Sequence, residues 1–237
     1  MYFRDRAEAG EILSGHLQNY KSRPDVLVLG LPRGGVPVAY EVARELNASL
    51  DVFMVRKLGV PGHEELGMGA IATGGVRILH EGIIRELAIS QPTIDLVSDR
   101  EQQELERRER LYRGDRPAPT IEGRIVIIVD DGLATGSTMK AAVQAIAQQN
   151  PARLIIAVPT APVETCEQLK QIADEVVCAI NPEPFFAVGG SYADFNQTTD
   201  EAVRDLIERA ARIRLGCENE CQITSDLHAG RRRPDPG

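Results

Sequence analysis

Short apolar runs alternate along the chain with segments whose apolar residues recur at helical spacing. The runs are rich in Val, Ile and Leu and end in Gly, Pro or acidic residues, which is typical of buried strands that end in turns. Helical segments separate these strands, so the pattern predicts an α/β fold with a mostly parallel central sheet flanked by helices. The expected strands are 25–31, 50–55, 124–129, 154–158 and 175–180, and the expected helices are 5–20, 36–46, 92–113, 137–148, 163–171 and 199–215.

Three segments depart from this alternation. Residues 58–75 are rich in Gly and poor in large apolar side chains, which predicts a long loop or loose hairpin, closed by 76–79, of the kind that often acts as a lid. Acids and bases alternate in 92–113, which indicates a solvated helix face, with a dimer-facing helix as the alternative. Residues 216–237 are polar and are expected to be disordered, leaving one domain over 1–215.

Charge and composition restrict the partners and the compartment. The chain of 237 residues has a formal net charge of −8, which argues against nucleic acid as a partner. No apolar run approaches the roughly 20 residues that span a bilayer, so no membrane partner is expected. The four cysteines form no C-x-x-C pair, which favours reduced thiols, and the first residues show no apolar signal core. We therefore expect a cytoplasmic protein, with a homodimer as the default assembly.

Residues 126–138 carry the most informative pattern. An apolar strand ends in Asp130 and Asp131, and a Gly/Thr/Ser loop leads from them into a helix. Open α/β sheets bind ligands at the carboxyl ends of their strands. Adjacent carboxylates repel each other and need a partner such as a sugar diol or hydrated magnesium, while N–H groups at a helix start suit a phosphate. The pattern indicates a phosphorylated ligand with hydroxyls. The alternative is a turn in which one acid merely caps a backbone N–H.

Two common nucleotide motifs are missing from this sequence. No Gly-Lys-Ser/Thr follows a glycine-rich loop, so there is no Walker A motif. Residues 67–72 do not complete a dinucleotide fingerprint, because Ala72 stands where the third glycine would be. Kinase-type use of ATP and NAD binding therefore lack support.

The segment 126–138 resembles the phosphoribosyl-diphosphate (PRPP) signature of type I phosphoribosyltransferases, and the expected topology of 25–180 is similar to the core of that family. The resemblance implies a type I phosphoribosyltransferase-like fold with a small hood, here from 58–75 and 182–196. It also implies transfer of 5-phosphoribosyl from PRPP to a nitrogenous base or similar small acceptor, with release of pyrophosphate. Mg²⁺ would be the cofactor, and the setting would be nucleotide and nucleoside metabolism.

The resemblance assigns roles residue by residue. Asp130 and Asp131 would be the catalytic pair, holding the ribose hydroxyls and contacting the metal through water or PRPP. The 5′-phosphate would be wrapped by Leu133, Ala134, Thr135, Gly136, Ser137 and Thr138. Pyrophosphate would be bound by Arg33, Gly34, Gly35, Arg56 and Lys57. Family members often have a non-proline cis peptide bond in the loop that 33–35 matches. The alternatives are a plain tight turn at 34–35 and a solvated strand end at 56–57.

Aromatic residues cluster in one irregular segment. Of the ten Phe and Tyr residues, four fall between Phe185 and Phe195, where they could stack on a flat base or form a small satellite core. The acceptor-binding candidates are Phe185, Phe186 and Tyr192. A general acid or base could come from 63–65, where His and Glu residues are also common for solubility alone.

The sequence does not match one acceptor class within the family. Ala134 stands where many purine-salvage members carry an Asp, and Asp131 is an acid that uracil-type members usually lack. The basic hood residues of orotate-type members are not evident in 58–75. The acceptor stays open, and so do two other functions on the same fold: a non-catalytic PRPP sensor, and a hydrolase acting on a phosphorylated sugar.

Overall fold

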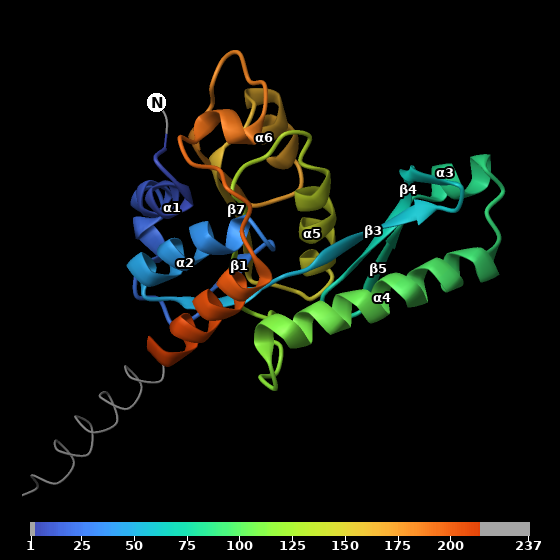
Figure 1. The fold of residues 1–237 in the computed structure, drawn as a ribbon, viewed down its shortest axis with the longest axis horizontal. Coiled ribbons are helices and arrows are strands. Elements are labelled where there is room, and N and C mark those ends of the chain that lie inside the picture. The colour runs from blue at the N-terminus through green and yellow to red at the C-terminus, as the bar shows by residue number, and fades with distance from the viewer. Residues whose placement is uncertain (1–2, 214–237) are drawn as a thin grey trace, which may run out of the picture.

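The computed structural model describes residues 3–213, which are built around a five-stranded sheet (Figure 1). Every neighbouring pair of strands in this sheet is parallel, as the sequence predicts. The strand order is β2 (Ser49–Val52), β1 (Val26–Gly30), β6 (Ile125–Val129), β7 (Arg153–Thr160) and β8 (Glu175–Ile180).

Helices cover both faces of the sheet, because successive side chains of each buried strand point to opposite faces. Val28 and Ile127 pack in the cluster formed with the first two helices, and Leu29 and Ile128 pack in the cluster formed with the fifth and sixth. Figure 1 shows these two helical layers on either side of the strands. The helices are α1 (Arg6–Gly15) and α2 (Gly35–Leu46) on one face, and α5 (Ser137–Ala147) and α6 (Val163–Leu169) on the other.

The chain changes direction between β1 and β6. After β1 it runs through α2 to β2 on one side, and after β6 it runs through α5 to β7 on the other. Loops that leave two neighbouring strands in opposite directions open a crevice at the carboxyl ends of those strands. The loop after β1 and the loop after β6 border this crevice, and they carry the two motifs that the sequence singles out.

A second, antiparallel sheet forms the hood. It consists of β3 (Val55–Val60), β4 (His63–Ala72) and β5 (Val76–Leu79), and we call it the hood sheet. With α3 (Glu81–Glu86) and α4 (Gln91–Arg113) it extends from the central sheet as an arm (Figure 1). Most of 58–75 is therefore strand: the expectation of a long loop is wrong, and the alternative of a hairpin closed by 76–79 is confirmed.

The glycines that suggest a loop in this region lie between closely packed strands. A Cβ on Gly69 would lie 2.3 Å from the carbonyl oxygen of Ile78, and one on Gly59 would lie 2.9 Å from that of Glu64. Glycine in a strand often marks such a close backbone approach.

A helix over 200–213 joins the base of the arm to the central domain. Val203 and Ile207 of this helix are buried in one cluster with Val36 of α2 and Tyr112 of α4. The Tyr112 hydroxyl donates a hydrogen bond to Asp200 Oδ1 (2.5 Å). The expected helix at 199–215 is thus present over the described residues, and the expected disorder of 216–237 lies outside them.

Other element boundaries shift by a few residues. The expected helix 5–20 ends at Gly15 and is followed by the short 3₁₀ helix η1 (Gln18–Tyr20), and the expected strand 50–55 is divided between β2 and β3. A second 3₁₀ helix, η2 (Val188–Ser191), follows β8. Among residues 3–213, no helix combines the length and the apolar character needed to cross a bilayer.

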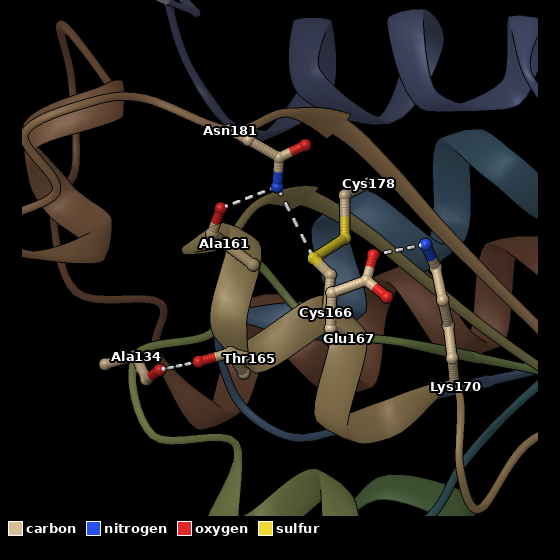
Figure 2. Close-up of a disulfide and its surroundings, with 8 residues drawn as sticks. All are labelled: Ala134, Ala161, Thr165, Cys166, Glu167, Lys170, Cys178 and Asn181. Atoms are coloured by element: carbon tan, nitrogen blue, oxygen red, sulfur yellow. Dashed lines mark hydrogen bonds and ion pairs between the residues drawn. A yellow bond between two sulfur atoms is a disulfide. The ribbon is translucent and has the colours of Figure 1, made fainter.

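A disulfide joins α6 to β8. It links Cys166 to Cys178, and Figure 2 shows it beside Asn181, whose amide donates to the carbonyl of Ala161 (2.8 Å) and to Cys166 Sγ (3.4 Å). The expectation of reduced thiols is therefore wrong for this pair. Periodicity places each cysteine on an element but does not show that α6 and β8 pack with these two positions facing each other.

Candidate functional site

The loop after β1 and the loop after β6 lie in contact across the crevice. A Cβ on Gly35 would lie 2.7 Å from the carbonyl oxygen of Val129 and 2.8 Å from Cα of Asp130, and one on Gly34 would lie 2.0 Å from Asp131 Oδ2. Only glycine leaves room for the acid pair at these positions. The bond between Pro32 and Arg33 is a cis peptide, as is often found in the loop that this segment resembles.

Asp130 is partly buried and is not paired with a cation in the described part of the chain. Its Oδ1 accepts the backbone N–H of Asp131 at 2.9 Å. Burial, together with the neighbouring Asp131 carboxylate, raises the pKa of Asp130 well above its usual value. The site thus holds a carboxylate whose charge would be stabilised by a cation or by hydroxyl donors from a ligand.

Asp131 is held from two sides. Its Oδ2 accepts a hydrogen bond from Nε of Arg6 (2.8 Å) and forms an ion pair with Nη2 of Arg6 (2.8 Å), and its backbone carbonyl accepts the hydroxyl of Tyr192. Burial raises the pKa of the Asp131 carboxyl, and Arg6 opposes that rise. Burial also raises the pKa of the Tyr192 phenol, so its hydroxyl stays protonated as a donor.

The loop over 132–138 surrounds the start of α5. Gly136 is the residue before the helix and has a φ of +68°, and no side chain caps the first N–H groups of α5. Thr135, Ser137 and Thr138 are exposed, so their hydroxyls are open to solvent beside those N–H groups. Exposed N–H groups at a helix start together with hydroxyls form an anion-binding arrangement.

Neighbouring elements fix the position of this loop. The N–H of Leu133 donates to the carbonyl of Thr160 at the end of β7 (2.9 Å), and Thr165 Oγ1 of α6 donates to the carbonyl of Ala134 (2.7 Å). Figure 2 shows that Thr165 precedes the disulfide cysteine Cys166 on α6. The loop is therefore attached both to the central sheet and to a helix that is covalently tied to β8.

The two basic residues predicted at the end of the second strand lie in the hood sheet. Arg56 pairs with Glu101 of α4 (Nε to Oε2, 2.7 Å), and Lys57 Nζ donates to the carbonyl oxygen of Glu65. Within residues 3–213, no hydrogen bond or ion pair joins Arg56 or Lys57 to the 132–138 loop. The side chain of Arg33, by contrast, forms no hydrogen bond or ion pair with the described residues, and Arg33 is partly exposed.

The aromatic candidates separate into two groups. Phe185 and Phe186 line a cavity of about 430 Å³ formed by residues after β8, and Phe186 is 88% exposed. Tyr192 does not line this cavity: it is buried between Phe3 and Phe195, with ring centroids 5.5 and 5.0 Å away. The structure places Tyr192 beneath the acid pair, where it packs and donates to Asp131. Its predicted stacking on an acceptor therefore has no geometric support.

The trio at 63–65 forms the exposed start of β4, directly after the turn from β3. Glu64 Oε1 accepts the N–H of Gly62 (3.2 Å), which is a local turn contact. The trio thus lies near the tip of a hairpin, and no hydrogen bond or ion pair among residues 3–213 joins it to the acid pair.

The donor set of the acid pair suits a magnesium ion that keeps water or ligand oxygens. Mg²⁺ prefers oxygen ligands and is commonly bound by one or two carboxylates plus substrate phosphates. Asp131 Oδ1 accepts no hydrogen bond from residues 3–213, and no group of three or more metal-binding side chains occurs among those residues. The protein alone thus offers two carboxylates, and a phosphorylated ligand would complete the coordination.

Arg6 and Thr165 shape this site but were not predicted from the sequence, and Gly132 was predicted only as part of the loop. Arg6 lies 125 positions from Asp131 in the sequence, and no local motif links the two. Thr165 sits on a different helix from the loop it holds. Gly132 has a φ of +158°, and a Cβ there would lie 2.5 Å from Val188 Cγ1, so it lets the segment after β8 approach the acid pair. Only Gly132 carried a local signal, because glycine in a strand-to-helix turn often marks such an approach.

A family model and curated relatives match this chain. The model for the phosphoribosyl transferase domain matches residues 4–194. A Mycobacterium tuberculosis protein with the provisional name phosphoribosyl transferase is 45% identical over 210 residues, which cover 89% of this chain and 47% of that protein. The chain therefore spans about half the length of the curated relatives it matches.

A solved structure matches more evenly. A protein from Thermus thermophilus is 43% identical, with a TM-score of 0.77, over 87% of this chain and 98% of that one. The fold described above is therefore shared with a protein of similar size.

Proposed function

Because the chain belongs to the phosphoribosyl transferase family, we propose that it transfers 5-phosphoribosyl from PRPP to a nitrogen of a small acceptor. The observation that carries this proposal is the crevice itself, in which the acid pair, two glycines and an uncapped helix start meet. Asp130 and Asp131 would bind the ribose hydroxyls, and the 133–138 loop would bind the 5′-phosphate through its N–H and hydroxyl groups.

In the proposed reaction a C–N bond forms at C1 of the ribose as the bond from C1 to the pyrophosphate oxygen breaks. Positive charge grows on the ribose, and negative charge grows on the leaving group. The acid pair would stabilise the sugar, while Arg33 and the N–H groups of 34–35 would bind the departing pyrophosphate. Holding the acceptor and donor together supplies much of the rate enhancement in reactions of this kind.

Mg²⁺ is the cofactor that this proposal requires. Asp130 and Asp131 would hold it through water or through PRPP oxygens, and the ion would neutralise charge on the pyrophosphate. Arg56 and Lys57 have partners within the hood, so contact with pyrophosphate would require them to exchange those partners.

We place the acceptor in the cavity lined by Phe185 and Phe186. The segment that forms this cavity is joined to the site, because Ser191 Oγ and Thr160 Oγ1 lie 2.8 Å apart and Val188 packs on Gly132. An exposed aromatic ring beside such a cavity suits a flat heterocycle. A nitrogenous base is therefore the acceptor class that we expect.

The first test is calorimetric binding of Mg²⁺–PRPP to the wild type and to the Asp130→Asn/Asp131→Asn variant. We expect binding by the wild type and its loss, by at least about a hundredfold, in the variant. The matched control is Glu86→Gln with Asp99→Asn, which removes the same charge from exposed positions of α3 and α4 and should bind like the wild type. Equal affinity in all three proteins would contradict the site assignment.

A panel of bases then separates transfer from sensing. Release of pyrophosphate that depends on one base supports the transferase. Tight PRPP binding without release for any base would support a PRPP sensor, and release without any acceptor would support a hydrolase.

A further inference from the structure

Arg6, the first residue of α1, connects three parts of the crevice. Its Nε donates to Asp131 Oδ2 (2.8 Å) and its Nη2 forms an ion pair with the same oxygen (2.8 Å). Its Nη1 donates to the carbonyl of Asn196 at 2.7 Å, and its guanidinium lies 4.0 Å from the ring centroid of Phe195. The side chain is 12% exposed, so these contacts hold it in one place.

The contact with Asp131 leaves one oxygen of that carboxylate available. The hydrogen bond from Arg6 Nε and the ion-pair contact of Arg6 Nη2 both go to Oδ2, the oxygen that also lies against Gly34. Oδ1 accepts no hydrogen bond from residues 3–213. A planar guanidinium that contacts a carboxylate oxygen through two of its nitrogens fixes the orientation of that carboxylate more strictly than a single point charge does. Arg6 therefore sets the direction in which Oδ1 faces.

We propose that Arg6 is a positioning residue, which orients Asp131 so that its free oxygen meets the sugar hydroxyls and which ties this carboxylate to the segment at 195–196. The inference rests on the proposed function, because it takes the ligand of the acid pair to be a phosphorylated sugar. Arg6 acts through Asp131 and is not itself a catalytic residue.

The fold near Arg6 does not depend on its side chain. Phe3 is fully buried, and its N–H donates to the carbonyl of Ser191 while its own carbonyl accepts the N–H of Ala193, both at 2.8 Å. The N–H of Asp194 donates to the carbonyl of Arg4 (2.8 Å), and Leu13 of α1 is buried under the sheet. A variant at position 6 should therefore keep α1 and the 191–194 segment in place.

The test compares two probes that share a phosphate but differ in the sugar. Ribose 5-phosphate and inorganic phosphate are titrated into the full chain and followed by ³¹P NMR. In Arg6→Gln we expect the affinity for ribose 5-phosphate to fall at least about tenfold, while the affinity for inorganic phosphate, which would use only the 133–138 loop, stays within about twofold. A merely structural role would weaken both probes together.

Two further variants complete the experiment. Arg6→Lys keeps the charge but offers no planar pair of donors, so it should recover part of the lost affinity. Arg4→Gln is the matched control: it removes the same charge two positions away, from a side chain that is 69% exposed and pairs with Asp5, and it should match the wild type. If Arg6→Gln did not fold, Arg6→Lys would carry the test, with an expected loss of at least about threefold for ribose 5-phosphate alone.

The outcomes separate this inference from the proposed function. If the wild type bound ribose 5-phosphate and Arg6→Gln bound it equally well, or lost both probes in parallel, the role of Arg6 would be overturned and the function would stand. A wild type that bound inorganic phosphate no more weakly than ribose 5-phosphate would overturn the sugar site, and both proposals with it.

Discussion

The acid pair makes the ligand-free protein less stable than it could be. Asp130 is partly buried, has a raised pKa and lacks a cation partner among residues 3–213, so keeping it ionised at neutral pH is unfavourable for the folded state. The pKa of Asp130 is higher in the folded chain than in the unfolded chain, so this destabilisation is absent at low pH. It begins as the pH rises above the pKa of the unfolded chain, and it is complete once the pH has passed the pKa of the folded chain. A ligand that supplies a cation or hydroxyls would reverse it.

We therefore expect Asp130→Asn to raise the melting temperature of the ligand-free protein at pH 7. A gain on the order of 1 kcal/mol corresponds to roughly 2–4 °C for a chain of this size. Scanning calorimetry without ligand measures it.

Asp131→Asn provides the contrast. Its carboxylate pairs with Arg6, so the substitution leaves a largely buried guanidinium without its partner and should lower the melting temperature. Equal shifts in the two variants would contradict this account of the site.

The sequence predicted the part of the site that is contiguous along the chain. Asp130, Asp131 and the loop that follows lie within one strand–loop–helix unit, so apolar patterning and glycine were enough to place them together. Arg6 could not be found in this way, because its contact depends on how α1 crosses the sheet. Tyr192 was noticed for its aromatic ring, yet its packing and its hydrogen bond to Asp131 are tertiary facts.

The hood sheet shows why strands are harder to recognise when glycine serves close packing. Gly59, Gly67 and Gly69 lowered the apolar content of the segment and indicated a loop, whereas each lies against a neighbouring strand or side chain in an antiparallel pairing. The central strands, which are buried on both faces, gave the continuous apolar runs that the hood strands lack.

The hydrogen bond between Tyr112 and Asp200 is expected to hold the helix at 200–213 against α4. Tyr112→Phe should lower the melting temperature at pH 8 by roughly 2–4 °C, since a buried hydrogen bond contributes about 1 kcal/mol. Circular dichroism melts measure the change. Tyr40→Phe is the control, because the Tyr40 ring packs under Arg209 (4.9 Å) and its hydroxyl makes no hydrogen bond within residues 3–213.

The same contact sets a pH window. Burial and the Asp200 carboxylate raise the pKa of Tyr112 to about 12, above the usual value of 10.0. The stability that this tyrosine contributes is therefore complete below about pH 10 and is lost as pH rises to about 12. The difference between wild type and Tyr112→Phe should disappear across that window, and a constant difference would show that the hydroxyl is not responsible.

The architecture of the whole chain followed from the order of its elements. Repeated strand–helix units predicted a parallel sheet, and the reversal between β1 and β6 then determined which loops could meet. The arm and the disulfide did not follow, because both depend on packing between segments that are not neighbours in the repeat. The matched part of this chain corresponds to about half the length of the curated relatives.

The disulfide between Cys166 and Cys178 makes the stability of the molecule depend on the redox conditions. The two cysteines are 12 positions apart, and closing a loop of that length raises the free energy of the unfolded chain by about 3 kcal/mol, which stabilises the folded state by that amount. Dithiothreitol would reduce the protein disulfide to two cysteine thiols and would itself be oxidised to a disulfide. The melting temperature of the protein should then fall by roughly 6–12 °C.

A Cys166→Ser/Cys178→Ser variant should melt at the temperature of the reduced wild type and should not respond to dithiothreitol. If dithiothreitol left the melting temperature of the wild type unchanged, the expected contribution of the disulfide to stability would be refuted. Thr165, which is adjacent to Cys166, donates a hydrogen bond to the carbonyl of Ala134. A reducing environment would therefore also affect the position of the loop that is proposed to bind a phosphate.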